Sequence, residues 1–265
     1  QKVFMVAGFL KRLRLGQGQG KTAAPSPSEP RLPSGVRIYA IGDIHGRLDL
    51  LEALYGLIDE DRAASPVTHN VEVFLGDYID RGSNSKQVID WFLAGPNRSS
   101  KRVTLMGNHE FFALEFLNNA SVLSSWGQYG GLETLFSYGL RLKMPLSEDE
   151  FEKVQAELRE VMPLTHVQFM QNCQLSSTMG GYYFVHAGVN PSLALKDQVA
   201  DDQLWIRDRF LEHDGPLEKI IVHGHTPSEG PEVEAFRIGI DTGAYITGRL
   251  TCAVLEGNEV RFIKT

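Results

Sequence analysis

Residues 71–82 read VEVFLGDYIDRG, an apolar run that ends in a glycine-flanked loop with two aspartates and an arginine. Short runs of β-branched and aromatic residues that stop at glycine are typical of buried β-strands. The same pattern recurs along the chain, each time with a polar residue beside the glycine. The runs of this kind are Val36–Ile41, Val71–Leu75, Arg102–Met106, Gly181–Val185, Lys219–Val222 and Phe236–Ile240.

Helical patterns follow the first three of these runs. Apolar residues recur at helical spacing over 48–58 after the first run and over 88–93 after the second. This alternation of strand and helix predicts an α/β fold. Near the end of the chain, the dipeptide 257–258 (Gly-Asn) separates the apolar runs 250–256 and 259–264 and predicts a two-residue β-hairpin. We therefore expect mixed rather than purely parallel sheets.

The chain divides into a tail and one folded domain. Residues 1–35 are rich in proline and serine and predict a flexible N-terminal tail and linker. Residues 36–265 are expected to form a single domain, because the candidate site residues are spread over most of it. Within it, residues 112–178 predict a helical insertion, in which Ser147 and Glu150 have the spacing of a capping box. This insertion either shapes access to the site or adds a packing layer.

Composition excludes several classes of protein. The chain has 265 residues and a formal net charge of −7, which argues against a sequence-independent nucleic-acid binder. Its two cysteines are far apart, so neither a disulfide framework nor a zinc finger is expected. No apolar run approaches the ~20 residues of a membrane-spanning helix. Residues 5–15 mix apolar and basic side chains and leave weak membrane-surface contact open beside a disordered tail. We expect a cytoplasmic protein.

Five short polar segments follow β-prone runs. They are 42–46 (GDIHG), 76–82 (GDYIDRG), 107–110 (GNHE), 186–188 (HAG) and 223–226 (HGHT). In open α/β sheets, ligands gather beyond the carboxyl ends of the strands, so all five loops can face one crevice. Their glycines let the backbone turn sharply and bring short side chains together.

These segments supply two carboxylates, three imidazoles and an amide, a mixed nitrogen and oxygen set that suits Mn, Fe or Zn. Six protein ligands are too many for one catalytic ion that must keep an open position. They suit two ions roughly 3.5–4 Å apart that share a carboxylate and a hydroxide. The candidate ligands are Asp43, His45, Asp77, Asn108, His186 and His225.

In this order, the segments resemble the signature of the metallophosphoesterase superfamily, and within it the PPP family of protein Ser/Thr phosphatases. The resemblance covers about residues 36–256. Residues 240–244 (IDTGA) are similar to the bacterial and phage branch, whereas eukaryotic members have a tyrosine there. The resemblance implies a calcineurin-like fold, a central β-sandwich of mixed sheets flanked by α-helices with a helical insertion. It also implies a site for two divalent ions, of which manganese is the first candidate. In this site Asp43, His45 and Asp77 bind one ion, and Asp77 bridges that ion to the second.

The resemblance also implies roles for side chains that bind no metal. Arg81 matches the arginine that holds the substrate phosphate, and Arg207, with Arg209 as its competitor, matches a second. His109 matches the histidine that protonates the leaving oxygen, and Asp80 the carboxylate that orients it. Arginine suits a phosphate dianion because its planar donors bind two oxygens at once. A histidine held by a carboxylate is a fitting general acid.

The expected function is hydrolysis of phosphate monoesters by a hydroxide held between the two ions, with phosphoserine or phosphothreonine in proteins as the first substrate and small phosphomonoesters as the next. A dinucleoside polyphosphate (Ap4A-type) hydrolase is the alternative enzyme. Glu110 and Thr226 argue against it, because hydrolases of that branch tend to have aspartate in place of Glu110 and to lack the threonine. A catalytically silent phosphoprotein-binding module is the alternative from another class, and the complete set of ligands stands against it.

Overall fold

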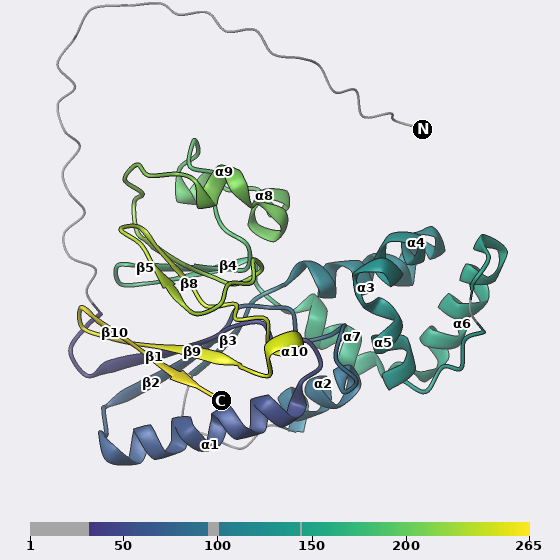
Figure 1. Ribbon diagram of the computed structural model, residues 1–265, viewed down its shortest axis with the longest axis horizontal. Helices are drawn as coiled ribbons and strands as arrows, with labels where there is room; N and C mark the ends of the chain where they lie inside the picture. The colour runs from purple at the N-terminus through teal and green to yellow at the C-terminus, as the bar shows by residue number, and fades with distance from the viewer. Residues whose placement is uncertain (1–31, 95–100, 144) are drawn as a thin grey trace, which may run out of the picture.

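The computed structural model describes residues 32–94, 101–143 and 145–265. The predicted tail over 1–35 therefore lies almost wholly outside the described residues. The described chain forms two five-stranded sheets with helices around them (Figure 1). Both sheets are mixed, and the predicted architecture of a β-sandwich flanked by α-helices is confirmed.

The first sheet has parallel strands at one edge and the C-terminal hairpin at the other. Strands β1, β2 and β3 run parallel to one another, and β9 and β10 are antiparallel to their neighbours. The hairpin turns at residues 257–258, as predicted. In sheet order the strands are β10 (Glu259–Lys264), β9 (Thr251–Glu256), β1 (Val36–Ile41), β2 (His69–Phe74) and β3 (Lys101–Thr104).

The second sheet also combines parallel and antiparallel strands, but in a different arrangement. Strands β5, β6 and β8 are parallel, and an antiparallel strand closes each edge. The two edge strands were not predicted from the sequence, because both are short and mostly polar. In sheet order the strands are β4 (Ser176–Met179), β5 (Tyr182–Val185), β6 (Ile220–His223), β8 (Arg237–Gly239) and β7 (Glu232–Val233).

Alternation along the buried strands divides the core into layers. In β1, Ile38 faces the second sheet and packs in one cluster with Phe184 and Val222, whereas Tyr39 packs with helix residues such as Leu54. Successive side chains of a strand point to opposite faces, so a strand covered on both sides is apolar throughout. Figure 1 accordingly shows α1 and α2 beneath the first sheet and α8 and α9 beyond the second.

The helices fall into three groups. Helices α1 and α2 follow β1 and β2, and α3 to α7 lie between β3 and β4, beside the sandwich (Figure 1). The short helices α8 to α10 follow strands β5 and β8 of the second sheet. Among the described residues, no helix is long and apolar enough to cross a membrane. The helices are α1 (Leu48–Ala64), α2 (Ser85–Ala94), α3 (Asn108–Asn118), α4 (Leu123–Trp126), α5 (Gly131–Ser137), α6 (Phe151–Val161), α7 (Leu164–Gln171), α8 (Ala200–Trp205), α9 (Asp208–Leu211) and α10 (Ala244–Thr247).

The capping box before α6 is present. The backbone N–H and the hydroxyl of Ser147 both donate to Glu150 Oε2, each at 2.9 Å. The helix buries Val154 and Leu158, as its apolar spacing predicts. Val161, the last residue of that face, is 45% exposed, because α6 ends there and the chain turns away before α7.

Candidate metal centre

Polar loops at the carboxyl ends of the parallel strands meet at one edge of the sandwich. The first sheet contributes the loops after β1, β2 and β3, and the second those after β5 and β6. The backbone N–H of His225 donates to Asp43 Oδ2 at 3.0 Å, a contact that joins the two sheets at this edge. The structure thus gathers all six predicted ligands: Asp43, His45, Asp77, Asn108, His186 and His225.

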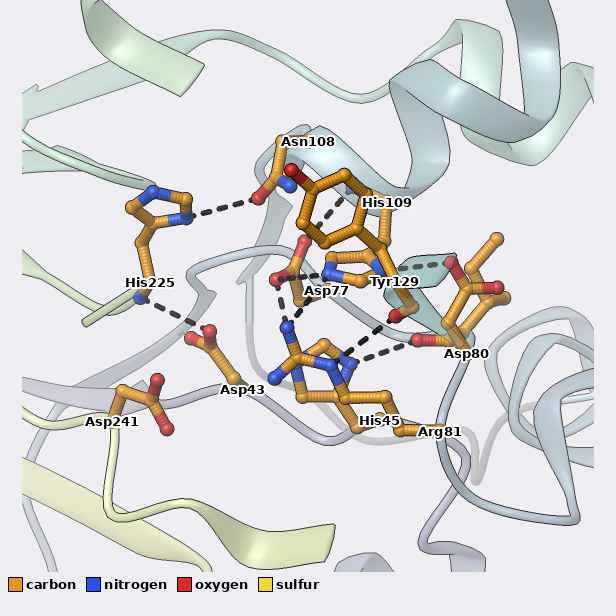
Figure 2. A network of polar contacts seen from close by, with 12 residues as sticks. Asp43, His45, Asp77, Asp80, Arg81, Asn108, His109, Tyr129, His225 and Asp241 are labelled. Carbon is orange, nitrogen blue, oxygen red and sulfur yellow. Dashed lines mark hydrogen bonds and ion pairs between the residues drawn. The ribbon is translucent and has the colours of Figure 1, made fainter. Parts of the chain in front are cut away.

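The Asp77 carboxylate lies at the centre of this cluster (Figure 2). Its Oδ2 is 3.5 Å from Nε2 of His45 and 3.8 Å from Nε2 of His109, and its Oδ1 is 3.4 Å from Nε2 of His186. It belongs to two tight groups of ligand atoms, one with His45 and His109 and one with His186 and His225. Asp43 lies outside both groups. A carboxylate shared by two such groups is suited to bridge two ions.

Acceptor atoms crowd together on the His186 side. Its Nδ1 lies 2.8 Å from the carbonyl oxygen of Leu75, so this nitrogen carries the proton and Nε2 is an acceptor. Nε2 lies 2.9 Å from Oδ1 of Asn108 and 3.2 Å from Nδ1 of His225. An imidazole nitrogen and an amide oxygen that are both acceptors repel each other unless a cation lies between them. This donor set therefore fits a metal ion.

Asp43 gives a second sign that the cluster fits a cation. Its Oδ1 is buried and has no hydrogen-bond partner in the described part of the chain. Gly224 is required beside it, because a Cβ at that position would collide with the same oxygen. Buried carboxylate oxygens are almost always satisfied, and a bound cation is one of the groups that can satisfy them.

The electrostatics of the site favour the protonation states in which most of these side chains can bind a metal ion. Burial lowers the pKa of His45 and His186, and that of His225 to about 2, so the three rings are neutral and free to ligate. Burial opposes ionisation of Asp77, but the histidines around it, including His109 with its raised pKa, outweigh it and lower the pKa of that carboxyl. For Asp43, burial and neighbouring carboxylates raise the pKa well above its usual value. A bound cation would reverse that shift by favouring the carboxylate.

The backbone is strained where the site is built. Five non-glycine residues of the described chain have a left-handed φ, between 47° and 71°. This region is costly for residues with a Cβ and is kept where the surrounding structure enforces it, often at functional sites. All five are predicted site residues: His45, Asp77, Asp80, Arg81 and His225.

Glu110 holds two of the loops together. Its buried carboxylate accepts backbone N–H bonds from Asp77, Tyr78 and Ile79 of one loop, at 2.8–3.2 Å, and from Gly107 of the other, at 3.0 Å. Burial and the nearby Asp77 raise its pKa to about 8. The side chain thereby fixes the backbone that presents Asp77.

Asp80 and His109 form a buried pair beside the cluster. Nδ1 of His109 lies 2.6 Å from Oδ2 of Asp80, which also accepts a 2.7 Å bond from Nε1 of Trp126. The hydroxyl of Thr134 donates to Oδ1 at 2.5 Å. Burial lowers the pKa of His109, but the charge of Asp77 and the bond to Asp80 outweigh it, so the net shift is upward. A raised pKa keeps the ring protonated at higher pH, as a proton donor requires.

The two predicted arginines lie on different sides of the site. Nη2 of Arg81 is 3.2 Å from Nε2 of His109, and its Nε donates to the carbonyl of Tyr129 at 3.4 Å. Arg207 is exposed and donates to the hydroxyl of Thr226 at 3.1 Å, next to His225. The competing Arg209 instead donates to Ser192.

Sequence reasoning missed three side chains of this site. Asp241 is 2% exposed, and Figure 2 shows it beside Asp43; burial raises its pKa to about 6. A signal for it was available, since it follows the β-prone run 236–240 as Asp77 follows its own run. Trp126 and Thr134 carry no such signal, because they reach Asp80 from the short helices α4 and α5, at positions 46 and 54 residues further along the chain.

Comparison with known proteins gives relatives for this architecture. A Schizosaccharomyces pombe protein named as a candidate serine/threonine-protein phosphatase is 29% identical over 231 residues, which cover 85% of this chain and 61% of that protein. A protein phosphatase 2A catalytic subunit of Dictyostelium discoideum is 25% identical over 232 residues, which cover 85% of this chain and 60% of that protein. The chain thus spans less than two thirds of the length of these relatives.

A solved structure described as a candidate diadenosine tetraphosphatase has the same fold, with a TM-score of 0.56 at 17% identity. The match covers 88% of this chain and 98% of that one. The sequence profile of the family described as calcineurin-like phosphoesterase matches residues 36–263. That match spans both sheets and every loop of the candidate metal centre, and the chain belongs to the calcineurin-like phosphoesterase family.

Proposed function

We propose that this chain is a metal-dependent phosphomonoesterase that dephosphorylates phosphoserine and phosphothreonine in proteins. Residues 36–265 form its catalytic domain, with a helical insertion, predicted as 112–178, whose last helix ends at Gln171 before β4. Its candidate ligands would hold two divalent ions, of which manganese is the first candidate. They are Asp43, His45 and Asp77 at one ion and Asp77, Asn108, His186 and His225 at the other.

One observation carries this proposal. Buried nitrogen and oxygen atoms of Asn108, His186 and His225 converge within 3.2 Å of one another, beside the Asp77 carboxylate, and Arg81 lies 3.2 Å from the adjacent His109. Two divalent ions bound there supply Lewis acidity toward water and phosphoryl oxygens. The neutral rings keep their lone pairs for these ions because burial disfavours their protonation.

The protein's own side chains bind the phosphate and deliver a proton. Arg81 and Arg207 hold phosphate oxygens through guanidinium N–H groups. A phosphate held by Arg81 lies within reach of Nε2 of His109, because the two side chains are neighbours at 3.2 Å. Asp80 fixes Nδ1 of that ring, so Nε2 is the atom that gives its proton to the leaving oxygen.

Protein substrates are favoured by the two relatives named as protein phosphatases. The environments of Glu110 and Thr226 agree with that preference: the first ties the Asp77 loop to the Asn108 loop, and the second contacts Arg207. An aspartate at position 110 would be one methylene too short to keep all four of the backbone contacts that Glu110 makes.

A side-by-side assay tests this proposal. We would measure kcat/KM for a phosphoserine peptide, a phosphothreonine peptide, diadenosine tetraphosphate and p-nitrophenyl phosphate, with Mn²⁺ added and with chelator. An Asp77→Asn preparation controls for contaminating phosphatase. Preference for the peptides supports the proposal. Preference for the dinucleotide replaces it with the alternative hydrolase, and binding of phosphopeptide without turnover of any substrate indicates a silent module.

A further inference from the structure

Arg81 contacts a carbonyl, an imidazole and an aromatic ring rather than a carboxylate. Among residues 32–94, 101–143 and 145–265, it makes no ion pair. Its guanidinium lies over the ring of Tyr245, 4.5 Å from the centroid, and its Nε and Nη2 contact a carbonyl and an imidazole. Its backbone N–H donates to Gly130, whose lack of a Cβ is required because Arg81 lies against it.

Tyr245 is itself fixed at the site. It lies on the short helix α10, which begins just after the loop of Asp241, and its ring meets that of His45 edge to face with centroids 5.2 Å apart. Arg47, two residues after His45, donates from Nη1 to the carbonyl of Ala244 at 2.9 Å. The ring therefore sits between a candidate metal ligand and the candidate phosphate-binding arginine, and the loop after β1 holds it there.

The chemistry of stacking explains why a ring suits this position. A carboxylate partner would occupy the N–H edge of the guanidinium, which is the edge that recognises phosphate. An aromatic face instead contacts the flat side of the group and leaves its in-plane donors free. Stacking also restricts a long side chain before the substrate arrives, which lowers the entropic cost of binding.

We infer that Tyr245 is a positioning residue, whose ring face holds the Arg81 guanidinium in the orientation that binds phosphate. The inference rests on the proposed role of Arg81. It goes beyond the site motifs, because Tyr245 lies 164 positions from Arg81 and outside all five polar segments.

The test uses inorganic phosphate as a competitive inhibitor of p-nitrophenyl phosphate hydrolysis. Tyr245→Leu removes the ring and should raise the phosphate inhibition constant and the KM about 3- to 10-fold, consistent with loss of a partly shielded cation–π contact. Tyr245→Phe keeps the ring and should restore affinity to within about twofold. Ile246→Ala is the matched control, because Ile246 is 72% exposed on the same helix and should leave these constants unchanged. Bound metal should stay equal in all variants.

A double-mutant cycle separates this inference from the proposed function. In an Arg81→Ala background, Tyr245→Leu should add no further loss, because the ring acts through the arginine. If Arg81→Ala itself leaves phosphate inhibition and kcat/KM unchanged, the proposed role of Arg81 fails. If Arg81→Ala impairs both but Tyr245→Leu does not, or if Tyr245→Phe is as damaging as Tyr245→Leu, the positioning role alone is overturned.

Discussion

His109 and Trp126 meet on a single oxygen of Asp80, the ring nitrogen at 2.6 Å and the indole nitrogen at 2.7 Å. The indole comes from the helical segment between β3 and β4, as does Thr134, which binds the other oxygen. These hydrogen bonds to both carboxylate oxygens oppose rotation of the Asp80 side chain away from His109. The helical segment does more than add a packing layer, because it orients the proposed proton donor.

Trp126→Phe tests this orientation. The substitution keeps an aromatic ring in the core but removes the N–H donor, so Asp80 loses one of its restraints. We expect turnover of a phosphoserine peptide to fall about 10-fold, part of the 10²–10⁴ that general acid catalysis supplies. Trp91→Phe is the matched control, since the Trp91 ring packs against Tyr55, Phe74 and Phe92, none of which is a candidate site residue. Equal losses in the two variants at equal metal content would contradict the orienting role.

Lowering the pH should remove the contribution that the ionised Glu72 carboxylate makes to the free energy of unfolding. Burial raises the pKa of this carboxyl, but hydrogen bonds from Tyr55 and Arg62 and the charge of Arg102 outweigh it, so the net shift is downward. The stabilisation is therefore fully present above the ordinary value of 4.5 and is lost as the pH falls below it toward the folded-state pKa. Glu72→Gln should lower the free energy of unfolding by about 2–3 kcal/mol at pH 7, less than for a fully buried pair because both arginines reach solvent.

Urea unfolding of wild type and Glu72→Gln from pH 7 to pH 3.5 measures this effect. The difference between the two proteins should shrink below pH 4.5. The exposed Glu52→Gln controls for the loss of one surface charge and should show little difference at any pH. A difference that stays constant down to pH 3.5 would mean that the Glu72 carboxylate contributes through packing rather than charge.

Metal removal should abolish activity, and Mn²⁺ should be among the best restorers. Asp77→Asn should be the most damaging of the ligand substitutions, because its two oxygens face both groups of candidate ligand atoms. Inductively coupled plasma analysis should find about two ions per chain in wild type and fewer than one in this variant. Full activity in a preparation verified as metal-free would refute the mechanism.

Arg207→Ala should weaken transition-state binding by about 2 kcal/mol, the lower end for loss of a preorganised charged donor, because Arg207 is exposed. Arg209→Ala is its matched control, two residues away with its guanidinium on Ser192. The measurement is kcat/KM for a phosphopeptide at low and high ionic strength. A larger loss for Arg209→Ala would move the second phosphate-binding role to that position.

Much of the fold could be predicted because its parallel strands are buried on both faces. Such strands are continuous apolar runs, so β1 was predicted with its observed ends and the other five runs to within two residues. The edge strands β4 and β7 carry no such run. Their pairing depends on a neighbouring strand that is already in place, which no local pattern records.

The residues of the candidate site also differ in whether local sequence could reveal them. Residues that follow a strand directly, such as Asp43, Asp77 and Asn108, are placed by the strand itself and can be found from local sequence. Trp126 and Tyr245 reach the site through tertiary packing of helices. No local pattern marks Trp126, and Tyr245 follows the segment 240–244, which resembled the family but received no site role from the sequence. Asp241 lies between these cases: its position after a β-prone run was visible, but its approach to Asp43 required the second sheet to pack against the first.

His109→Asn should separate alkyl from aryl phosphates. A serine alkoxide is strongly basic and needs a proton in the transition state, whereas p-nitrophenolate leaves readily without one. The loss of kcat/KM should therefore be about 10²–10⁴-fold on phosphoserine peptides and much smaller on p-nitrophenyl phosphate.

Asp80→Asn should show the same trend more mildly, because that side chain orients the ring through a 2.6 Å contact and transfers no proton to substrate. Bound metal must be measured in every variant, since His109 lies 3.8 Å from Asp77. Equal losses on both substrates at full metal occupancy would leave His109 a phosphate-binding or supporting residue.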